Sequence, residues 1–321
     1  MKIGIIGPGK IAERFIAAVK QVEGVEVAAA ASTNIERAKE FCKRNGVSKA
    51  YGSWAELLKD CDIDAVYVSV INAFHYEAVV KSLEAGKAVI CEKPMGLSFE
   101  ETDSMLKLAE KKKLLFMECL WTLHLPCILQ AKRWINDGKI GRMLYIDCNF
   151  SFFAPESVVP RLFNKNLGGG ALYDVGIYDI IFSAFMNDST VESVKASSFI
   201  GTTGVDEMGA SLIKFEDGVV ANCRYGIRVP MSGKACIYGE NGYIEFDEFW
   251  KCPKAVLKDS RGHIIDTVED LREEGFTYQI EAFRDAFAEG KIEVEHAAHA
   301  ASRNAAIIID QIRREIGLTD H

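Results

Sequence analysis

The sequence of 321 residues contains no apolar run near the roughly 18 to 20 residues that cross a bilayer. Its first residues lack the long apolar stretch and small-residue cleavage site of a signal peptide. There is no basic stripe, because the formal net charge is −8 and the acidic and basic residues are interspersed. The one basic run, 111–113, falls where an amphipathic helix should end. We therefore expect a cytoplasmic protein that binds neither membrane nor nucleic acid.

Patterns for disulfides and metal sites are also scarce. The nine cysteines are an odd number without a CxxC pair, and most lie in or beside apolar segments, where free cysteine behaves as a small hydrophobe. His296 and His299 stand three residues apart beside Glu293 and Glu295, which suggests a metal site. Two histidines on a terminal helix are more often surface or packing residues. We expect neither a disulfide framework nor a metal centre.

What the chain does have is a regular alternation of apolar strands and amphipathic helices in its first half. Such continuous apolar runs are typical of strands buried on both faces, and the alternation predicts a parallel sheet with right-handed crossovers. The length itself favours two domains. We predict a doubly wound Rossmann domain over residues 1–122. Its strands are expected at 2–7, 25–32, 65–70, 88–91 and 114–119, and its helices at 10–22, 35–45, 74–85 and 98–111.

The pattern changes after Trp121, and residues 123–321 are predicted to form a second α/β domain. Short strands separated by turn signals such as EDG and ENG favour a largely antiparallel, open-faced sheet. The strands are expected at 143–153, 193–200, 208–215, 219–225, 234–238 and 243–246. Helices are expected at 125–137, 171–186, 278–289 and 297–316.

The first motif with chemical meaning is a GxGxxA loop between the first strand and the first helix. Gly7 permits the tight turn, Gly9 lets a pyrophosphate approach the backbone, and Ala12 lets the helix pack on the sheet. The helix N-terminus attracts the phosphates. The alternative is a merely tight turn. The predicted cofactor-binding residues of this loop are Gly7, Pro8, Gly9, Lys10 and Ile11.

The end of the second strand should distinguish NAD from NADP. NAD-binding proteins usually place a carboxylate there, whereas Ser32, Thr33 and Asn34 stand here, with Arg37 one turn later. Hydroxyls and a guanidinium suit a 2′-phosphate better than a free diol. We therefore predict NADP, with NAD possible, and Ser32, Thr33 and Arg37 as ligands. The alternative for Arg37 is an exposed helix residue.

Further motifs resemble those of the glucose–fructose oxidoreductase/inositol dehydrogenase (Gfo/Idh/MocA) family. That family has an Asn-x-x-His segment after its third strand, a Glu-Lys-Pro segment after its fourth, and GGG-x-L-x-D-x-G-x-H in its second domain. The chain has Tyr178 in place of that last histidine, as in the dihydrodiol (xylose) dehydrogenase branch, which Glu118–Trp121 also resembles. The matching residues are Asn72 and His75, Glu92-Lys93-Pro94, and 167–178.

The resemblance implies an NAD(P)-dependent dehydrogenase or reductase that acts on a sugar, polyol or diol. It implies cofactor contacts from Asn72, His75, Glu92 and Lys93, although His75 could merely start its helix. It also implies a homo-oligomer, a dimer or a dimer of dimers, that pairs through the open sheet. The second domain would then bind substrate and dimerise, and the active site would lie in the cleft at the carboxyl ends of the strands.

For the chemistry we predict Tyr178 as general acid/base, with Lys93 and Asp174 as its partners. An unperturbed tyrosine has a pKa near ~10 and is a poor base at neutral pH, but a neighbouring ammonium favours the phenolate. Lys93 could itself hold the reacting oxygen. Asp174 and Tyr178 are four residues apart, so a helix places them on one face, where Asp174 can accept hydrogen bonds from substrate hydroxyls. Trp121 is either a substrate contact or a packing residue at the domain interface.

Two other functions are consistent with these motifs. One is a non-catalytic regulator that binds a dinucleotide on the same fold. The other is a reductase of a non-sugar carbonyl or imine. The presence of Lys93 and of the Asp174–Tyr178 pair argues against the regulator.

Overall fold

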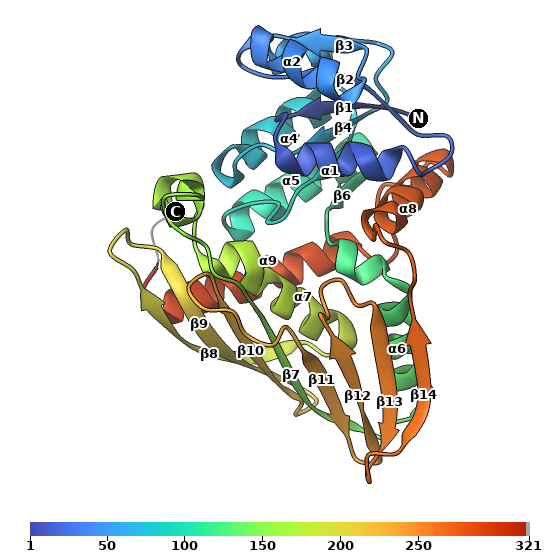
Figure 1. The fold of residues 1–321 in the computed structure, drawn as a ribbon, viewed down its shortest axis with the longest axis vertical. Coiled ribbons are helices and arrows are strands. Elements are labelled where there is room, and N and C mark those ends of the chain that lie inside the picture. Colours follow the sequence, from blue (N-terminus) through green and yellow to red (C-terminus); the bar gives the residue numbers. More distant parts are fainter. Residues whose placement is uncertain (319–321) are drawn as a thin grey trace. The chain divides into compact units, whose positions relative to one another are not determined.

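The computed structural model describes residues 1–318, and Figure 1 labels its elements. The residues divide into two compact units. The first unit comprises Met1–Trp121 and Phe276–Ser302. The second comprises Thr122–Gly275 and the residues from Arg303 onward. The short 3₁₀ helix η2 (Trp121–His124) contains one of the boundaries.

The first unit is built on a six-stranded sheet in which all neighbouring strands are parallel. The strand order is β3-β2-β1-β4-β5-β6, so the direction of winding reverses between β1 and β4, as in a doubly wound Rossmann fold. All residues of β4 and β5 are buried, which explains their uninterrupted apolar sequences. The strands are β1 (Lys2–Ile6), β2 (Glu26–Ala31), β3 (Lys49–Tyr51), β4 (Ala65–Val68), β5 (Ala88–Cys91) and β6 (Phe116–Glu118).

Side-chain caps fix where several helices of this unit begin. Asn34 accepts hydrogen bonds from the backbone amides of Glu36 and Arg37, and Ser98 accepts one from Glu101. The basic run 111–113 ends its helix as expected, with Lys113 in the left-handed region. The helices are α1 (Lys10–Val19), α2 (Ile35–Asn45), α3 (Trp54–Leu58), η1 (Asn72–Phe74), α4 (His75–Glu84), α5 (Phe99–Lys112) and α8 (Phe276–Ala288).

Helix α8 follows the second unit in sequence but belongs to the first unit. Its Arg284 guanidinium donates a hydrogen bond to the carbonyl of Glu23 at 3.0 Å, just after α1. The backbone of Phe116 in β6 also donates to the carbonyl of Ile292 at 3.0 Å. The sequence pattern predicts this helix, but not that the chain returns to the first unit to form it.

The second unit is built on an eight-stranded sheet of order β14-β13-β12-β11-β7-β10-β9-β8. Only the β7–β10 pair is parallel among its described strand pairs, so the expected largely antiparallel sheet is confirmed. Its strands are β7 (Met143–Ser151), β8 (Val191–Ile200), β9 (Asp206–Phe215), β10 (Val220–Gly226), β11 (Ala235–Gly239), β12 (Gly242–Asp247), β13 (Lys254–Asp259) and β14 (Ile264–Glu269). Its helices are α6 (Pro126–Asn136), η3 (Pro160–Phe163), η4 (Lys165–Leu167), η5 (Leu172–Gly176), α7 (Ile177–Met186) and α9 (His299–Glu315), whose first turn belongs to the first unit.

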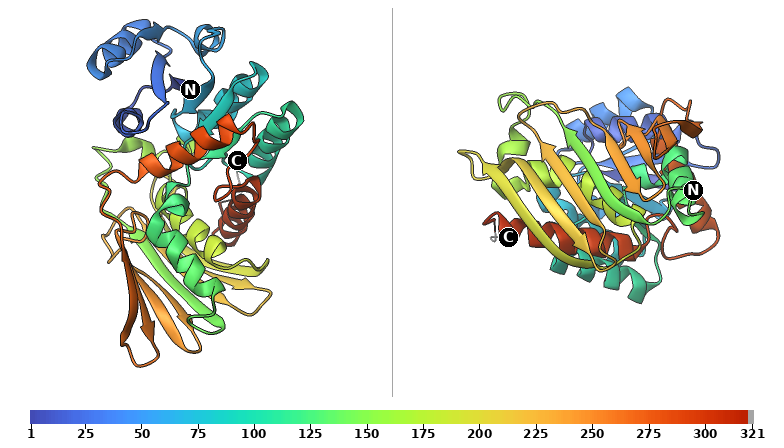
Figure 2. Two further views of the ribbon diagram at one scale, coloured as in Figure 1. Left: turned by 90° about the vertical axis from the view of Figure 1, so that its right-hand side faces the viewer. Right: turned by 90° about the horizontal axis from the view of Figure 1, so that it is seen from below.

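Helices α6 and α7 pack on one face of this sheet, and the right view of Figure 2 looks onto the other face. On that other face Tyr145, Leu212 and Tyr238 are 36%, 48% and 43% exposed. The sheet is therefore open on one side, as the sequence predicts. Within residues 1–318, no helix combines the length and apolar character that a membrane crossing requires.

Three strands are absent from the sequence-based prediction, and each has a physical reason. Strand β3 has only three residues. Edge strand β14 is almost fully exposed, and Ile264 and Ile265 are 66% and 55% exposed, so pairing with β13 rather than burial forms it. Strand β13 pairs with this edge strand and follows a turn-rich segment, which hides its short alternating pattern.

Candidate active site

The turn from β1 to α1 has the form that a dinucleotide-binding loop requires. Gly7 has φ = +99°, and a Cβ there would lie 2.6–2.7 Å from backbone atoms of Ser69 and Val70, just after β4. By contrast, a Cβ on Gly9 would have no neighbour within 4 Å among the described residues. The fold itself therefore requires glycine at position 7, whereas the open space beside Gly9 fits the approach of a pyrophosphate.

The first turn of α1 supplies the donors for such a group. Gly9 is the N-cap and provides no side-chain hydrogen bond, so the first backbone amides lack the cap that Asn34 gives to α2. Ala12 is fully buried and lets the helix approach the sheet. The remaining residues of the predicted loop differ in exposure: Pro8 is buried, Ile11 is partly buried and Lys10 is exposed. The loop fits a dinucleotide pyrophosphate.

The end of β2 presents the residues predicted to select the cofactor. The Ser32 hydroxyl is almost buried and accepts the Asn34 amide at 3.3 Å, and Thr33 is exposed. Asn34 itself caps α2. Across residues 1–318, no ion pair or side-chain hydrogen bond occupies the Arg37 guanidinium, which is exposed. Arg37 is therefore available to a ligand at the tip of this strand.

Asn72 and His75 lie in the loop and first helical turn after β4. Asn72 begins η1, and His75 is buried at the start of α4. The two ring nitrogens of His75 lie 2.8 Å from the Pro94 carbonyl and 3.0 Å from the Val70 carbonyl. These contacts join the loops that follow β4 and β5, and His75 also starts α4, as the alternative interpretation of this residue expects. A cofactor contact from His75 stays a prediction.

Lys93 lies directly after β5, between buried acidic groups. The residue is partly buried, and the Lys93–Pro94 peptide bond is cis. Glu92 is 8% exposed, and its carboxyl accepts a hydrogen bond from the hydroxyl of Tyr67, a fully buried residue of β4. Glu118 accepts the amide of Met95 at 2.8 Å. Burial raises the pKa of both carboxyls, that of Glu118 to about 7.

Trp121 is a packing residue within the first unit. It is 4% exposed, its ring centroid lies 5.3 Å from that of Phe276, and the Arg14 guanidinium stands 5.0 Å over it. Phe276 and Arg14 both belong to the first unit, so packing at a domain interface and a substrate contact both stay predictions for Trp121.

In the second unit, the glycine run before η5 is required by close backbone packing. A Cβ on Gly169 would lie 2.6 Å from the Leu162 carbonyl oxygen, and one on Gly170, whose φ is +120°, would lie 2.3 Å from the Asp206 carboxylate. Asp206 is 1% exposed and accepts the Leu172 amide at 2.7 Å. It therefore caps the helical segment that carries Asp174. Burial raises the pKa of Asp206 to about 7.

The expected helix over 171–186 is present, but its first part is a π-helical turn rather than an α-helix. This turn, η5, contains Asp174, and the ring of Tyr225 packs directly against its last residue, Gly176. Such turns often occur at functional sites. Asp174 is 15% exposed through its side chain, and an Arg161 guanidinium nitrogen lies 3.4 Å from its carboxylate. The structure thus gives Asp174 a cationic neighbour that sequence spacing did not assign.

Tyr178 is 9% exposed and stands beside an aromatic stack. Its ring meets Phe150 edge to face at 5.3 Å between centroids, and Phe150 stacks on Trp250 at 3.9 Å. The next residue, Asp179, is fully buried, and its carboxyl faces the Cys148 thiol and the Phe150 backbone amide. Burial raises the pKa of Asp179 well above its ordinary value. Phe150, Trp250 and Asp206 come from distant strands and loops, so no local pattern identified them.

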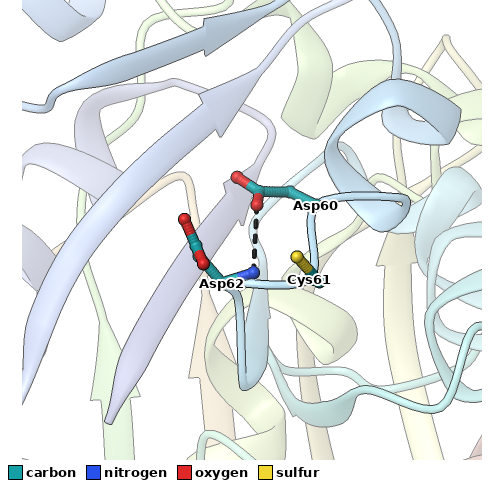
Figure 3. Close-up of side chains that lie close together, drawn as sticks. All are labelled: Asp60, Cys61 and Asp62. Atoms are coloured by element: carbon teal, nitrogen blue, oxygen red, sulfur yellow. Dashed lines mark hydrogen bonds between the residues drawn. The ribbon is translucent and has the colours of Figure 1, made fainter.

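The residues with metal-ligand chemistry have other partners. Figure 3 shows Asp60, Cys61 and Asp62 close together on one turn. The Lys49 ammonium donates to the carboxylates of Asp60 at 2.8 Å and Asp62 at 2.9 Å, so an internal cation already neutralises them. His299 is buried, with its ring nitrogens 3.2 Å from the Glu110 carboxylate and 3.2 Å from the Phe116 carbonyl.

Taken by themselves, the fold and the β1–α1 loop define a dinucleotide-binding protein of two units. A family model described as "Oxidoreductase family, NAD-binding Rossmann fold" matches residues 1–119. A second, described as "GFO/IDH/MocA C-terminal domain", matches residues 128–245. The chain therefore belongs to the GFO/IDH/MocA family. It is an NAD(P)-dependent oxidoreductase, which confirms the expected fold, family and cofactor class.

Individual relatives cover almost the whole chain. Trans-1,2-dihydrobenzene-1,2-diol dehydrogenase from Danio rerio is 31% identical, covering 99% of this chain and 97% of the relative. The protein of that name from Xenopus laevis is also 31% identical, covering 99% and 98%. A crystal structure of a 3-ketoreductase from Actinomadura kijaniata, with NADP and TDP-benzene, is 26% identical, with a TM-score of 0.89 and 98% of each chain covered. The similarity to the dihydrodiol dehydrogenase branch is thus confirmed.

Proposed function

We propose that this protein catalyses the reversible NADP-dependent oxidation of one hydroxyl group of a sugar, polyol or vicinal diol. One observation carries the proposal. Lys93, Asp174 and Tyr178 are all present in a chain that resembles trans-1,2-dihydrobenzene-1,2-diol dehydrogenases over 99% of its length. The two units carry these residues separately, and the family resemblance is the reason to place them in one site.

The chemistry assigns a different task to each side chain. When bound, the nicotinamide accepts or supplies the hydride. Tyr178 takes the hydroxyl proton during oxidation and returns it during carbonyl reduction. The Lys93 ammonium favours the phenolate of Tyr178 and holds the reacting oxygen. Asp174, whose carboxylate lies 3.4 Å from an Arg161 guanidinium nitrogen, accepts hydrogen bonds from the adjacent hydroxyls of the substrate.

The preference for NADP rests on Ser32, Thr33 and Arg37. Arg37 is exposed in the first turn of α2, just after β2, and no ion pair within residues 1–318 occupies its guanidinium. A 2′-phosphate offers this guanidinium a charge-assisted partner, whereas a free ribose diol does not. The solved 3-ketoreductase complex with NADP is consistent with this choice.

A substrate panel with both cofactors tests the proposal. It contains aldoses, inositols, vicinal diols including a dihydrodiol, dicarbonyls, a nucleotide-linked keto sugar and an imine. We expect turnover of a polyol or diol with NADP, or of the matching carbonyl with NADPH. Turnover of the imine alone would support the non-sugar reductase instead. Cofactor binding without turnover of any panel member would support the non-catalytic regulator.

On the substrate that the panel identifies, Lys93→Met and Tyr178→Phe are each expected to lower kcat by about 10² to 10⁴-fold. Nucleotide affinity should change little, and Asp174→Asn should mainly lower kcat/KM. The double variant Lys93→Met/Tyr178→Phe should lose much less than the product of the single losses, because groups that share one step are non-additive. Fully multiplicative losses would contradict a proton-transfer step shared by Lys93 and Tyr178, but they would not affect the Rossmann assignment.

The remaining predictions concern organisation. We propose that residues 1–122, joined by 276–302, bind the cofactor, and that the rest of 123–321 binds substrate and dimerises. The exposed Tyr145, Leu212 and Tyr238 on the open sheet face support a homo-oligomer formed through that face. Sedimentation that gives only a monomer at micromolar concentration would contradict it.

A cytoplasmic location stays a prediction, which fluorescence microscopy of a tagged chain can check.

A further inference from the structure

Two carboxyl groups are buried beside the Lys93 turn, and the mechanism above uses neither. Glu92 is bonded to the Tyr67 hydroxyl. Glu118, the last residue of β6, is only 3% exposed. Its Oε1 atom accepts the amide of Met95 at 2.8 Å, two residues after Lys93, and its carboxyl also hydrogen-bonds to Ser302.

Burying the Glu118 carboxyl costs free energy, and its hydrogen bonds offset part of that cost. A buried amide that loses its acceptor destabilises the fold, and an apolar side chain at position 118 would leave the Met95 amide without this acceptor. The carboxyl therefore ties the turn that carries Lys93 to β6 and to the first turn of α9. All of these residues belong to the first unit.

The charge of Glu118 also acts on Lys93. The ionisable groups that face Glu118 are the Lys93 ammonium, the Glu92 carboxyl and the thiols of Cys91 and Cys119, and the Ser302 hydroxyl completes its surroundings. Burial raises the pKa of Glu118 to about 7, while Ser302, the Met95 amide and Lys93 oppose this and Glu92 adds to it. The carboxyl therefore changes charge within the neutral pH range.

We propose that Glu118 is a positioning residue for Lys93: it holds the Lys93–Met95 turn by hydrogen bonds, and its ionisation controls how strongly the Lys93 ammonium is stabilised. Glu118 touches neither cofactor nor substrate in this scheme. The inference rests on the proposed function only in taking Lys93 as the group whose charge matters to catalysis. The electrostatic part concerns the first unit and is testable without turnover.

The test uses Glu118→Gln, which keeps the size and the Oε1 acceptor but removes the charge. Lys93 reactivity is measured from pH 5.5 to 9 by competitive acylation and peptide mass spectrometry, since only the neutral amine reacts. Without the opposing charge, acylation of Lys93 at pH 8 should rise by about tenfold, because a nearby opposite charge shifts an ionisation by about one unit or more. The wild-type profile should show an inflection near pH 7 that is absent from the variant.

Glu101→Gln is the matched control. Glu101 also accepts a backbone amide of this loop, that of Leu97 at 2.9 Å, but from α5 and without facing Lys93. We expect its acylation profile and kcat to match the wild type. For Glu118→Gln we expect kcat to fall about tenfold, with KM nearly unchanged and thermal stability close to the wild type. Glu118→Asp, which keeps the charge, should restore the inflection.

An acylation profile of Glu118→Gln identical to that of the wild type would overturn the inference. A rise in Lys93 acylation in Glu101→Gln equal to that in Glu118→Gln would also overturn it. If Glu118→Gln does not fold, the wild-type profile decides alone, and a smooth titration without an inflection near pH 7 refutes the inference. Failure of the proposed function looks different. In that case Lys93→Met retains turnover, while the effect of Glu118→Gln on the acylation of Lys93 is unchanged.

Discussion

Gly7 and Gly9 lie two residues apart in one loop, yet substitution by valine should affect them in opposite ways. At Gly9, a Cβ meets no atom within 4 Å among the described residues, and φ is −119°, a value that any residue adopts. The cost to folding is then the loss of a good N-cap residue, about 1 kcal/mol or less. The added methyl groups occupy the space that the pyrophosphate needs. Gly9→Val should therefore fold normally and lose dinucleotide binding.

At Gly7 the same substitution acts on the fold itself. The left-handed backbone costs an L-residue about 1–2 kcal/mol. The overlap with backbone atoms of Ser69 and Val70 at 2.6–2.7 Å adds about 1–3 kcal/mol, because backbone must move to relieve it. Gly7→Val should thus lose about 2–5 kcal/mol of stability, a large share of the total for a typical domain.

Thermal unfolding and calorimetric titration with NADPH separate the two effects. For Gly9→Val we expect an unfolding temperature within a few degrees of the wild type and no measurable binding. For Gly7→Val we expect a much lower unfolding temperature. Wild-type affinity in Gly9→Val would refute the placement of the phosphates, and wild-type stability in Gly7→Val would refute the packing argument.

Two further predictions concern the cofactor and the buried acid on α7. Arg37→Ala should weaken NADP binding about tenfold or more beyond its effect on NAD, since a charged hydrogen bond is worth about 1.5–3 kcal/mol; equal losses measured by titration with both cofactors would end the NADP assignment. Burial raises the pKa of Asp179, so its contribution to stability is fully present below the unfolded-state pKa near ~3.9 and is lost as pH rises through the folded-state pKa. Asp179→Asn should remove a decline in the free energy of unfolding of at most about 1.4 kcal/mol per pH unit as pH rises above the unfolded-state pKa, measured by urea unfolding; a wild-type-minus-variant difference that stays constant with pH would contradict the buried-acid assignment.

Local sequence signals anticipated the first unit well. The apolar runs of β4 and β5 are continuous because both faces of a parallel sheet are covered, and the caps at Asn34 and Ser98 mark helix starts directly. The predictions missed elements whose stability comes from pairing rather than burial. Edge strand β14 is held by β13 while its own side chains face solvent, so its hydrophobic pattern carries little information.

For the candidate site, sequence patterns identified the residues but not their surroundings. Lys93, Asp174 and Tyr178 were found by motif and family resemblance, and they come from different units of the fold. The contacts around each came only from the fold. Arg161 reaches Asp174 from a separate 3₁₀ turn, Phe150 from β7 packs on Tyr178, and these partners share no spacing rule.

The sequence by itself determined the alternation of strands and helices, the GxGxxA loop and the family, because these depend on periodicity and on residues close together in the chain. The tertiary structure alone decided the environment of the buried acids. The sequence does not show how far Glu118, Asp179 and Asp206 are removed from solvent. Each is at most 3% exposed in the fold, and burial raises its pKa. Desolvation depends on everything that packs around a group, most of it distant in the chain, so no local pattern can reveal it.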